Sequence, residues 1–343
     1  MASTEQIAKE YYDKGMSLIH INNVELGIDN LNMAKSIYEE LGDSSNYIMT
    51  LRGLAVAYGI MGYDSKMLFK CLDALNYLDK NRIQGAKHLF YTTICNRYML
   101  LGDYDSAINY GKMAMQDLEE YGTFFNNDPK SYLIACMNLA YSYLHTHRFA
   151  DSETYLKRAS DIAQKNDLHY HDFSLAILYA SLHHQLGDDQ YVYDHMDDLA
   201  GFMKNPFITI QDYIEDLELL VETFCSMKEF DKAEAVAKNL DSTATISNDH
   251  NLKLESSKLY MNVYKKSGDT DKYHQACVRY AEDSLAQKKL WLQSIFWRWT
   301  HQLHCLLRTR QMNYYNISYE KENNNYSDCG CCSGHNSKSR AYI

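Results

Sequence analysis

Four residues that could bind a metal ion lie close together near the end of the chain, in the segment DCGCCSGH. They are Cys329, Cys331, Cys332 and His335, and thiolates and imidazoles are the ligands that Zn²⁺ prefers. Their spacing differs from the paired cysteines of structural zinc sites, and adjacent cysteines fit poorly into one tetrahedral site. We therefore expect no metal ion and no cofactor, and we favour an irregular tail over a zinc site.

Four histidines form two close pairs in the middle of the chain. His169 and His171 lie in LHYHDF, and His183 and His184 lie in SLHHQLG. Two ligands of a helical metal site are four residues apart, and neither pair has that spacing. The sequence also contains no glycine-rich phosphate loop, HExxH motif or GGDEF signature. These observations predict a protein that is not an enzyme.

Composition and charge restrict the class of protein further. The 343 residues carry a formal net charge of −11, which argues against a general nucleic-acid binder. The chain contains only two prolines, and such a scarcity of helix breakers favours helices. No stretch reaches the roughly 18 apolar residues of a membrane span, and the first residues lack the apolar run of a signal peptide. We expect a cytoplasmic protein with no membrane span and no nucleic-acid partner.

A helix–turn–helix pattern recurs along the chain with a period of about forty residues. With Ala107 as the reference, the equivalent positions are Gly27, Met67, Ala107, Ser152, Val192, Ala233 and Tyr273. Twelve residues earlier lie Gly15, Ala55, Cys95, Ala140, Ala180, Val221 and Met261. Small residues at these positions let two antiparallel helices approach closely, and larger ones fill the gap to the next unit. Seven such units predict a solenoid.

The small–large–small pattern is clearest in LAVAYGIMGYDSKMLFKCLDA, LAYSYLHTHRFADSETYLKRA and MKEFDKAEAVAKNL. Over residues 4–285 the chain resembles the tetratricopeptide repeat family. The resemblance implies an all-α fold, a right-handed superhelix of about seven helical hairpins. The period exceeds the 34 residues usual in the family, which indicates longer helices. We expect the solenoid to cover residues 4–296 and to end in one long helix over residues 271–296.

The resemblance also implies a binding groove on the concave side of the superhelix. In the family, polar side chains three residues before and one residue after the small position of each first helix hold a peptide backbone. These positions and their neighbours are Arg52, Thr92, Asn96, Asn138, Tyr141 and His184. Two mapped positions, Met137 and Ile177, are apolar and depart from the pattern. The polar residues either bind an extended peptide, which asparagine can do as donor and acceptor at once, or only solvate the groove.

The character of the sequence changes after residue 296. WRWTHQLHCLLRTR is basic and aromatic, and the residues beyond it show no periodicity. The basic segment fits an amphipathic helix that touches a membrane surface or a partner, and it equally fits a capping helix with a solvated face. We expect residues 297–343 to form an irregular, basic and cysteine-rich tail.

Tetratricopeptide-like regions that end in a helix such as QKKLWLQSIF resemble the sensory halves of bacterial GGDEF diguanylate cyclases. In that family a catalytic domain follows the helix and opens with a motif like D-x-L-T. If the codons for residues 298–301 are read one nucleotide later, they can encode Asp-Gly-Leu-Thr. The same shift lets residues 329–335 encode Val-Ala-Val-Val-Val-Asp-Ile, which is similar to the first strand of a GGDEF domain. The tail then fits an out-of-frame remnant of a lost cyclase domain.

Together these patterns predict a non-enzymatic module that binds a peptide or protein segment in its concave groove. The resemblance to cyclases implies the sensory or scaffold part of a bacterial signalling protein. Two alternatives stay open: a truncated or frameshifted diguanylate cyclase that lost its GGDEF domain after residue 296, and a zinc or cyclase activity in the tail. A homodimer formed through the end of the solenoid is a further expectation, because the tail carries aromatic side chains.

Overall fold

The computed structural model describes residues 3–21, 23–122, 128–203 and 213–289. In these residues the chain forms helices and turns and no strand. The helices are α1 (Thr4–His20), α2 (Val24–Leu41), α3 (Ser44–Ile60), α4 (Asp64–Lys80), α5 (Lys87–Leu100), α6 (Tyr104–Tyr121), α7 (Pro129–His145), α8 (Phe149–Lys165), the 3₁₀ turn η1 (His169–His171), α9 (Asp172–Gln185), α10 (Asp189–Asp194), α11 (Met196–Met203), α12 (Ile214–Ser226), α13 (Phe230–Ser247) and α14 (His250–Ser267). A last helix covers residues 270–289.

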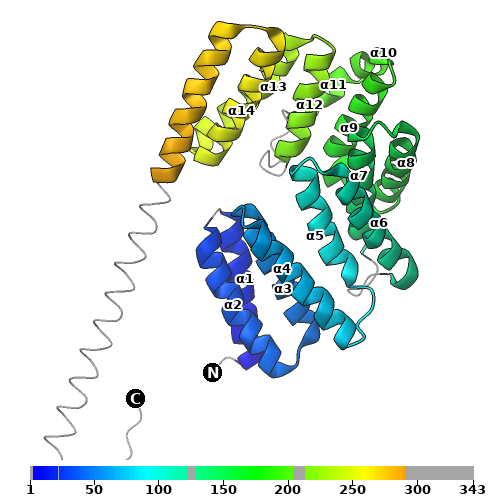
Figure 1. Ribbon diagram of the computed structural model, residues 1–343, viewed down its shortest axis with the longest axis vertical. Helices are drawn as coiled ribbons and strands as arrows, with labels where there is room; N and C mark the ends of the chain where they lie inside the picture. Colours follow the sequence, from blue (N-terminus) through cyan, green and yellow to red (C-terminus); the bar gives the residue numbers. More distant parts are fainter. Residues whose placement is uncertain (1–2, 22, 123–127, 204–212, 290–343) are drawn as a thin grey trace, which may run out of the picture.

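The described helices pair into seven hairpins, as the repeat predicts (Figure 1). In the fifth hairpin the second helix is split in two, because α10 ends at Asp194 and α11 begins at Met196. The other second helices are continuous. The first helices are α1, α3, α5, α7, α9, α12 and α14, and the second helices follow them in the chain.

Aspartate and serine side chains start many of these helices. The side chains of Ser3, Asp43, Asp103 and Asp249 each accept a hydrogen bond from a backbone N–H of the first helical turn. Such caps satisfy donors that have no partner inside the helix. Asp128 caps α7 in the same way, with Pro129 as its first residue, and proline is favoured at the first position of a helix.

The small positions of the repeat lie inside the hairpins. Ala107 and Ala114 of α6 are completely buried. A methyl group added to Gly27 of α2 would lie 2.9 Å from the carbonyl oxygen of Gly15 in α1 and 2.6 Å from Cγ1 of Ile19. Van der Waals contact begins beyond these distances, so glycine alone permits so close a helix pair. The small residues therefore serve helix packing.

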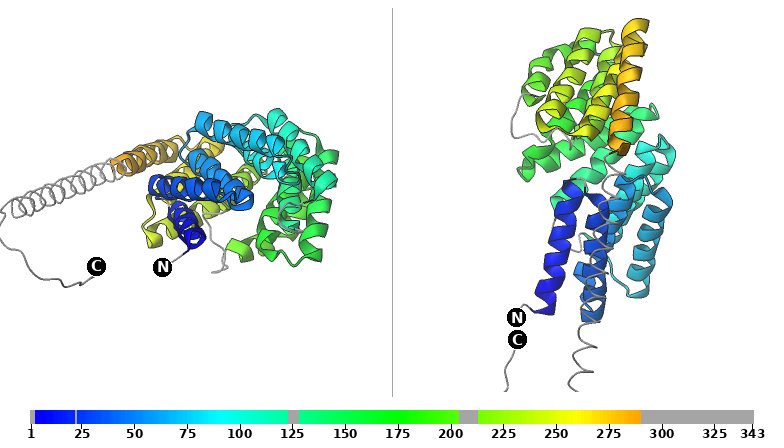
Figure 2. Two further views of the ribbon diagram at one scale, coloured as in Figure 1. Left: turned by 90° about the horizontal axis from the view of Figure 1, so that it is seen from below. Right: turned by 90° about the vertical axis from the view of Figure 1, so that its left-hand side faces the viewer.

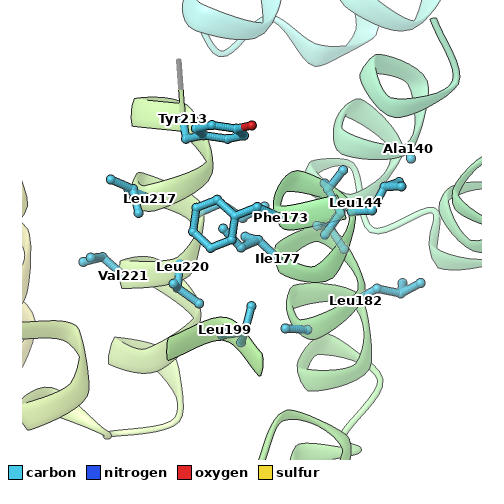
Figure 3. Packing of buried hydrophobic residues seen from close by; sticks show 14 of the residues in the cluster. Ala140, Leu144, Phe173, Ile177, Leu182, Leu199, Tyr213, Leu217, Leu220 and Val221 are labelled. Atoms are coloured by element: carbon cyan, nitrogen blue, oxygen red, sulfur yellow. The ribbon is translucent and has the colours of Figure 1, made fainter. Parts of the chain in front are cut away.

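The largest hydrophobic cluster extends from α6 of hairpin 3 to α14 of hairpin 7. Figure 3 shows Phe173 and Ile177 of α9 between α7 and α12, close to Leu144, Leu217 and Leu220. Phe173 is 1% exposed and Ile177 is completely buried. The apolar character of Ile177, at a position mapped to the groove, therefore has a packing role.

Consecutive first helices contact one another along the chain, from α1 to α3 and onward to α14. They form a continuous inner layer, and the chain winds as a right-handed superhelix (Figure 2). The first two hairpins come to lie below hairpins 6 and 7 (Figure 1).

Candidate functional site

Two of the predicted groove residues meet on the inner layer. Asn96 lies on α5 and Asn138 on α7, and Nδ2 of Asn138 donates a hydrogen bond to Oδ1 of Asn96 at 2.5 Å. Asn96 is exposed and Asn138 is half-buried. One bond uses only part of the capacity of two amides, so donors and acceptors remain for a further partner. The sequence positions alone did not indicate that these two side chains touch.

Arg52 and Thr92 lie on the first helices α3 and α5, and both are half-buried. Burial lowers the pKa of the Arg52 guanidinium, while Tyr12 of α1 and Asp128 at the start of α7 favour its charged form. The buried Nε of Arg52 has no hydrogen-bond partner in the part of the chain that the structure describes. Arg52 therefore places a positive charge at the N-terminal side of the inner layer.

Tyr141 belongs to an aromatic cluster with Tyr104 and His145. The ring centroids of Tyr104 and His145 are 4.4 Å apart and stacked, and those of Tyr141 and His145 are 4.5 Å apart. Burial, followed by the nearby Tyr104 and Glu222, raises the pKa of Tyr141. Burial lowers the pKa of His145 to about 4, so its imidazole is neutral at pH 7.

His184 is engaged within its own hairpin. Its Nδ1 lies 2.6 Å from Oδ1 of Asp189 in α10. The neighbouring His183 lies 3.0 Å from Asp188 and stacks on Tyr191. Asp189 therefore provides the partner that holds His184 at the turn, and the bond between Asn96 and Asn138 does not involve His184.

Three carboxylates of α12 face the inner layer, and the groove mapping above does not include them. Glu215, Glu218 and Glu222 are spaced by three and four residues, which places them on one helix face. Burial, then the neighbouring Glu255, raises the pKa of Glu218 to about 7. Glu215 is exposed, yet the protein that surrounds it raises the pKa of its carboxyl as well.

The repeat pattern could have indicated two of these carboxylates as groove residues. Val221 is the small or apolar position of the sixth unit, and it is completely buried. Glu218 lies three residues before it and Glu222 one residue after it. Extending the mapping from the fourth and fifth units to the sixth would have included both. The charged segment EDLELLVE is typical of a helix face exposed to solvent. In this protein that face lies on the concave side of the solenoid.

A cavity of about 1460 Å³ lies between the first three hairpins and the last two. Its wall includes the ends of α3 and α5, the start of α12 and the turn between α13 and α14. Glu215, Glu218 and Glu255 line it together with Arg97 and Lys258. Lys258 pairs with Glu255 at 2.8 Å and Arg97 pairs with Asp64 at 2.5 Å. None of the six predicted groove residues lines this cavity, since they lie elsewhere on the inner layer.

Four of the five cysteines that precede the tail are buried among the core residues, and Cys277 is half-buried. Burial raises the pKa of Cys71 and of Cys95 to about 12, so both thiols stay protonated at pH 7. No described helix has the length and apolar character that a membrane crossing needs. Within residues 3–289 as described, no group of histidine, cysteine, aspartate or glutamate has the arrangement of a metal site.

Several sequence predictions fall outside the described residues. They are the end of the long helix at Phe296, the tail over residues 297–343 with its cysteine cluster, and the out-of-frame cyclase remnant. All of them stay predictions.

No protein-family model and no curated protein match the sequence. Among solved structures, the apo form of RapI matches with a TM-score of 0.48 and 13% identity, over 84% of this chain and 87% of that chain. A putative kinesin light chain of Podosopora anserina with TPR-like repeats matches with a TM-score of 0.45 and 13% identity, over 59% and 96%.

A Rap protein complexed with competence and sporulation factor has a TM-score of 0.55 and 16% identity, over 85% of this chain and 78% of that chain. This chain has a tetratricopeptide-like solenoid fold. The predicted all-α superhelix of about seven hairpins is confirmed. At such low identity the likeness extends to the fold and no further.

Proposed function

We propose that this solenoid is a non-enzymatic binding module that holds an extended peptide or protein segment against its inner layer. The observation that carries the proposal is the contact between Asn96 and Asn138 across two consecutive first helices. A peptide backbone presents N–H and C=O groups in alternation, and a pair of amides can both donate to it and accept from it. The Rap protein of similar fold is complexed with competence and sporulation factor, which supports a binding role for this shape.

The charges of the inner layer indicate the chemistry of the ligand. Within the described part of the chain Glu215, Glu218 and Glu222 form no ion pair, whereas Arg97 and Lys258 are paired. A cationic side chain that docks against α12 would relieve the repulsion between these carboxylates. We therefore infer a segment with at least one lysine or arginine, and we expect its affinity to fall as salt is added.

The experiment is a selection of random peptides with the full-length chain, followed by fluorescence anisotropy of the enriched sequences. Replacing Asn138 by alanine removes its amide from the inner layer and leaves that of Asn96 unpaired. Losing one or two hydrogen bonds predicts affinity that is about 10- to 100-fold weaker.

Asn32→Ala is the matched control, because Asn32 is an exposed asparagine of the second helix α2. This variant should bind like the unchanged chain. If no peptide is enriched, or if Asn138→Ala binds as tightly as Asn32→Ala, the proposed site is wrong.

The finer proposal is that the module is the sensory or scaffold part of a bacterial signalling protein. It rests on the resemblance of its repeats and last helix to the sensory halves of GGDEF cyclases. Sequencing the gene beyond the codon for Phe296 tests the alternative of a lost cyclase domain. A GGDEF signature in a second reading frame would support that alternative, and its absence from all three frames would contradict it.

A further inference from the structure

The cavity between the two ends of the solenoid has walls of different character. It has a volume of about 1460 Å³ and lies between the first three hairpins and the last two. Sites for drug-sized ligands have volumes of about 300 to 1,000 Å³, so this cavity is large enough for a peptide segment. Its two walls come from opposite ends of the chain, and each indicates one property of the ligand that fits between them.

The wall that comes from the first three hairpins carries large apolar side chains. Ile60 is the last residue of α3 and Leu100 is the last residue of α5, and each is 54% exposed. Ile21, which follows α1, is 73% exposed. All three residues line the cavity, and we call them the apolar wall. Single exposed apolar residues are common, but three that share one cavity are typical of an interaction site.

The opposite wall is acidic. Glu215 and Glu218 of α12 line the cavity, and neither forms an ion pair within the described part of the chain. Lys258 lies on the same wall, but it pairs with Glu255. A carboxylate that is removed from water without a cation beside it costs free energy. This wall therefore favours a ligand that carries a positive charge.

Two further residues of the cavity have polar atoms without a partner. Nε of Arg97 in α5 and Nδ1 of His250 at the start of α14 are buried, and neither forms a hydrogen bond with the described residues. Both residues line the cavity. A buried polar atom that lacks a partner costs free energy, and the N–H and C=O groups of a peptide can supply the missing bonds. A peptide therefore suits this cavity better than a purely apolar molecule.

We propose that this cavity binds a peptide segment that carries both a large apolar side chain and a cationic one. The apolar side chain docks on the apolar wall, and a lysine or arginine docks against Glu215 and Glu218. The site rests on the proposed function in one respect, because both place the cation at the carboxylates of α12. It adds an apolar requirement, and it is separate from the contact between Asn96 and Asn138, which do not line the cavity.

The test is a selection of random peptides with full-length variants, in which the enriched residue types are compared. The unchanged chain should enrich peptides that contain a large apolar residue together with lysine or arginine. The double variant Ile60→Ser, Leu100→Ser should lose the enrichment of large apolar residues and keep that of lysine and arginine. The double variant Glu215→Gln, Glu218→Gln should show the opposite change, with an affinity that depends less on salt.

Fluorescence anisotropy of the peptides that the unchanged chain enriches gives the size of the effect. The Ile60→Ser, Leu100→Ser variant should bind them about 10-fold more weakly. The double variant Leu101→Ser, Leu186→Ser is the matched control and should bind them normally. Leu101 and Leu186 are 56% and 53% exposed at the ends of α5 and α9, and neither lines the cavity. Circular dichroism checks that all four serine positions, being exposed, leave the fold unchanged.

Equal enrichment of large apolar residues by the apolar-wall variant and by its control would overturn the proposal. Unchanged enrichment of lysine and arginine by the double glutamine variant would overturn it as well. If weaker binding by Asn138→Ala accompanied either result, the proposed function would stand and only the cavity site would fail. If no peptide were enriched by the unchanged chain, both would fail.

Discussion

At the scale of single residues, the hairpin turns show how the chain tolerates strain. Gly62, Gly102 and Gly187 adopt positive φ where the first helix of a hairpin ends, as glycine does without cost. In two other hairpins the equivalent residues are His147 and Lys228, with φ of 57° and 64°. A side chain at positive φ costs about 1 kcal/mol. The protein is therefore less stable at these two turns than it would be with the glycine that other hairpins have there.

Lys228→Gly should raise the free energy of unfolding by about 0.5 to 1 kcal/mol. The reason is relief of the left-handed conformation at an exposed residue, where the side chain contributes little packing. Urea unfolding followed by circular dichroism measures the change. Gly102→Lys, the reverse substitution in the third hairpin, should lower the stability by a similar amount. A destabilised Lys228→Gly variant would show that the lysine side chain has a role at this turn.

Glu218 makes stability depend on pH. Burial raises its folded-state pKa from 4.5 to about 7, so the folded state holds this proton more tightly than the unfolded state. Its contribution is therefore fully present at low pH and is lost as the pH rises from about 4.5 to 7. Glu218→Gln should be more stable than the unchanged chain at pH 8, by about 1 to 2 kcal/mol after allowance for solvent.

At pH 5 the same two chains should unfold at nearly equal urea concentrations. Glu10→Gln, a change at an exposed position of α1, serves as the control at both pH values. Equal stability of Glu218→Gln and the unchanged chain at pH 8 would mean that water reaches the carboxylate freely.

At the scale of helices, close pairs depend on small residues and buried polar contacts. In hairpin 1 the backbones of α1 and α2 approach at Gly15 and Gly27. In hairpin 3 the carboxylate of Asp117 in α6 accepts a hydrogen bond from the backbone N–H of His88 at 2.9 Å. Both side chains are nearly inaccessible, and the contact supplies a partner for a donor at the start of α5. Hairpins 1 and 3 are thus held together by small residues and by a buried hydrogen bond, neither of which an isolated helix would need.

Gly27→Ala should destabilise the chain by about 2 kcal/mol, because the added methyl overlaps the backbone of α1. Gly59→Ala in α3 is the control, since its methyl would meet only Cγ of Met67 at an ordinary 3.6 Å. That variant should gain up to about 1 kcal/mol from the helix propensity of alanine. Thermal unfolding separates the two outcomes, and a neutral Gly27→Ala would mean that α1 and α2 can move apart without loss.

At the scale of the whole molecule, stability is distributed over neighbouring hairpins. Each first helix packs against the next, and a solenoid of this kind draws its stability from units and their interfaces. The last helix adds to this through the hydrogen bonds from Arg279 to Asp241 and from Ser257 to Asp283. These contacts end before residue 290.

A chain that ends at Lys289 should therefore remain helical and should unfold in one cooperative transition. We expect its unfolding midpoint, at a concentration where both chains are monomeric, to lie within about 2 °C of the full-length value. Differential scanning calorimetry provides the comparison. Loss of cooperativity would show that residues 290–343 are an integral part of the fold.

The helical repeat was determined by the sequence, because antiparallel helices that pack closely require small residues at regular intervals along the chain. The predicted positions are buried in six units, from Gly27 to Ala233, and only the seventh, Tyr273, is half-buried at the end of the solenoid. The start of α7 at Pro129 was also predictable, since capping is a local property of adjacent residues.

The tertiary structure alone decided which polar side chains meet. Asn96 and Asn138 lie 42 residues apart and touch because consecutive hairpins stack. His184, another predicted groove residue, pairs with Asp189 in its own hairpin. Glu215 and Glu218 of α12 line a cavity whose other wall comes from the first three hairpins. Such contacts depend on how the superhelix winds. The winding is the sum of small rotations between consecutive units, and these rotations leave no pattern in the sequence of any single unit.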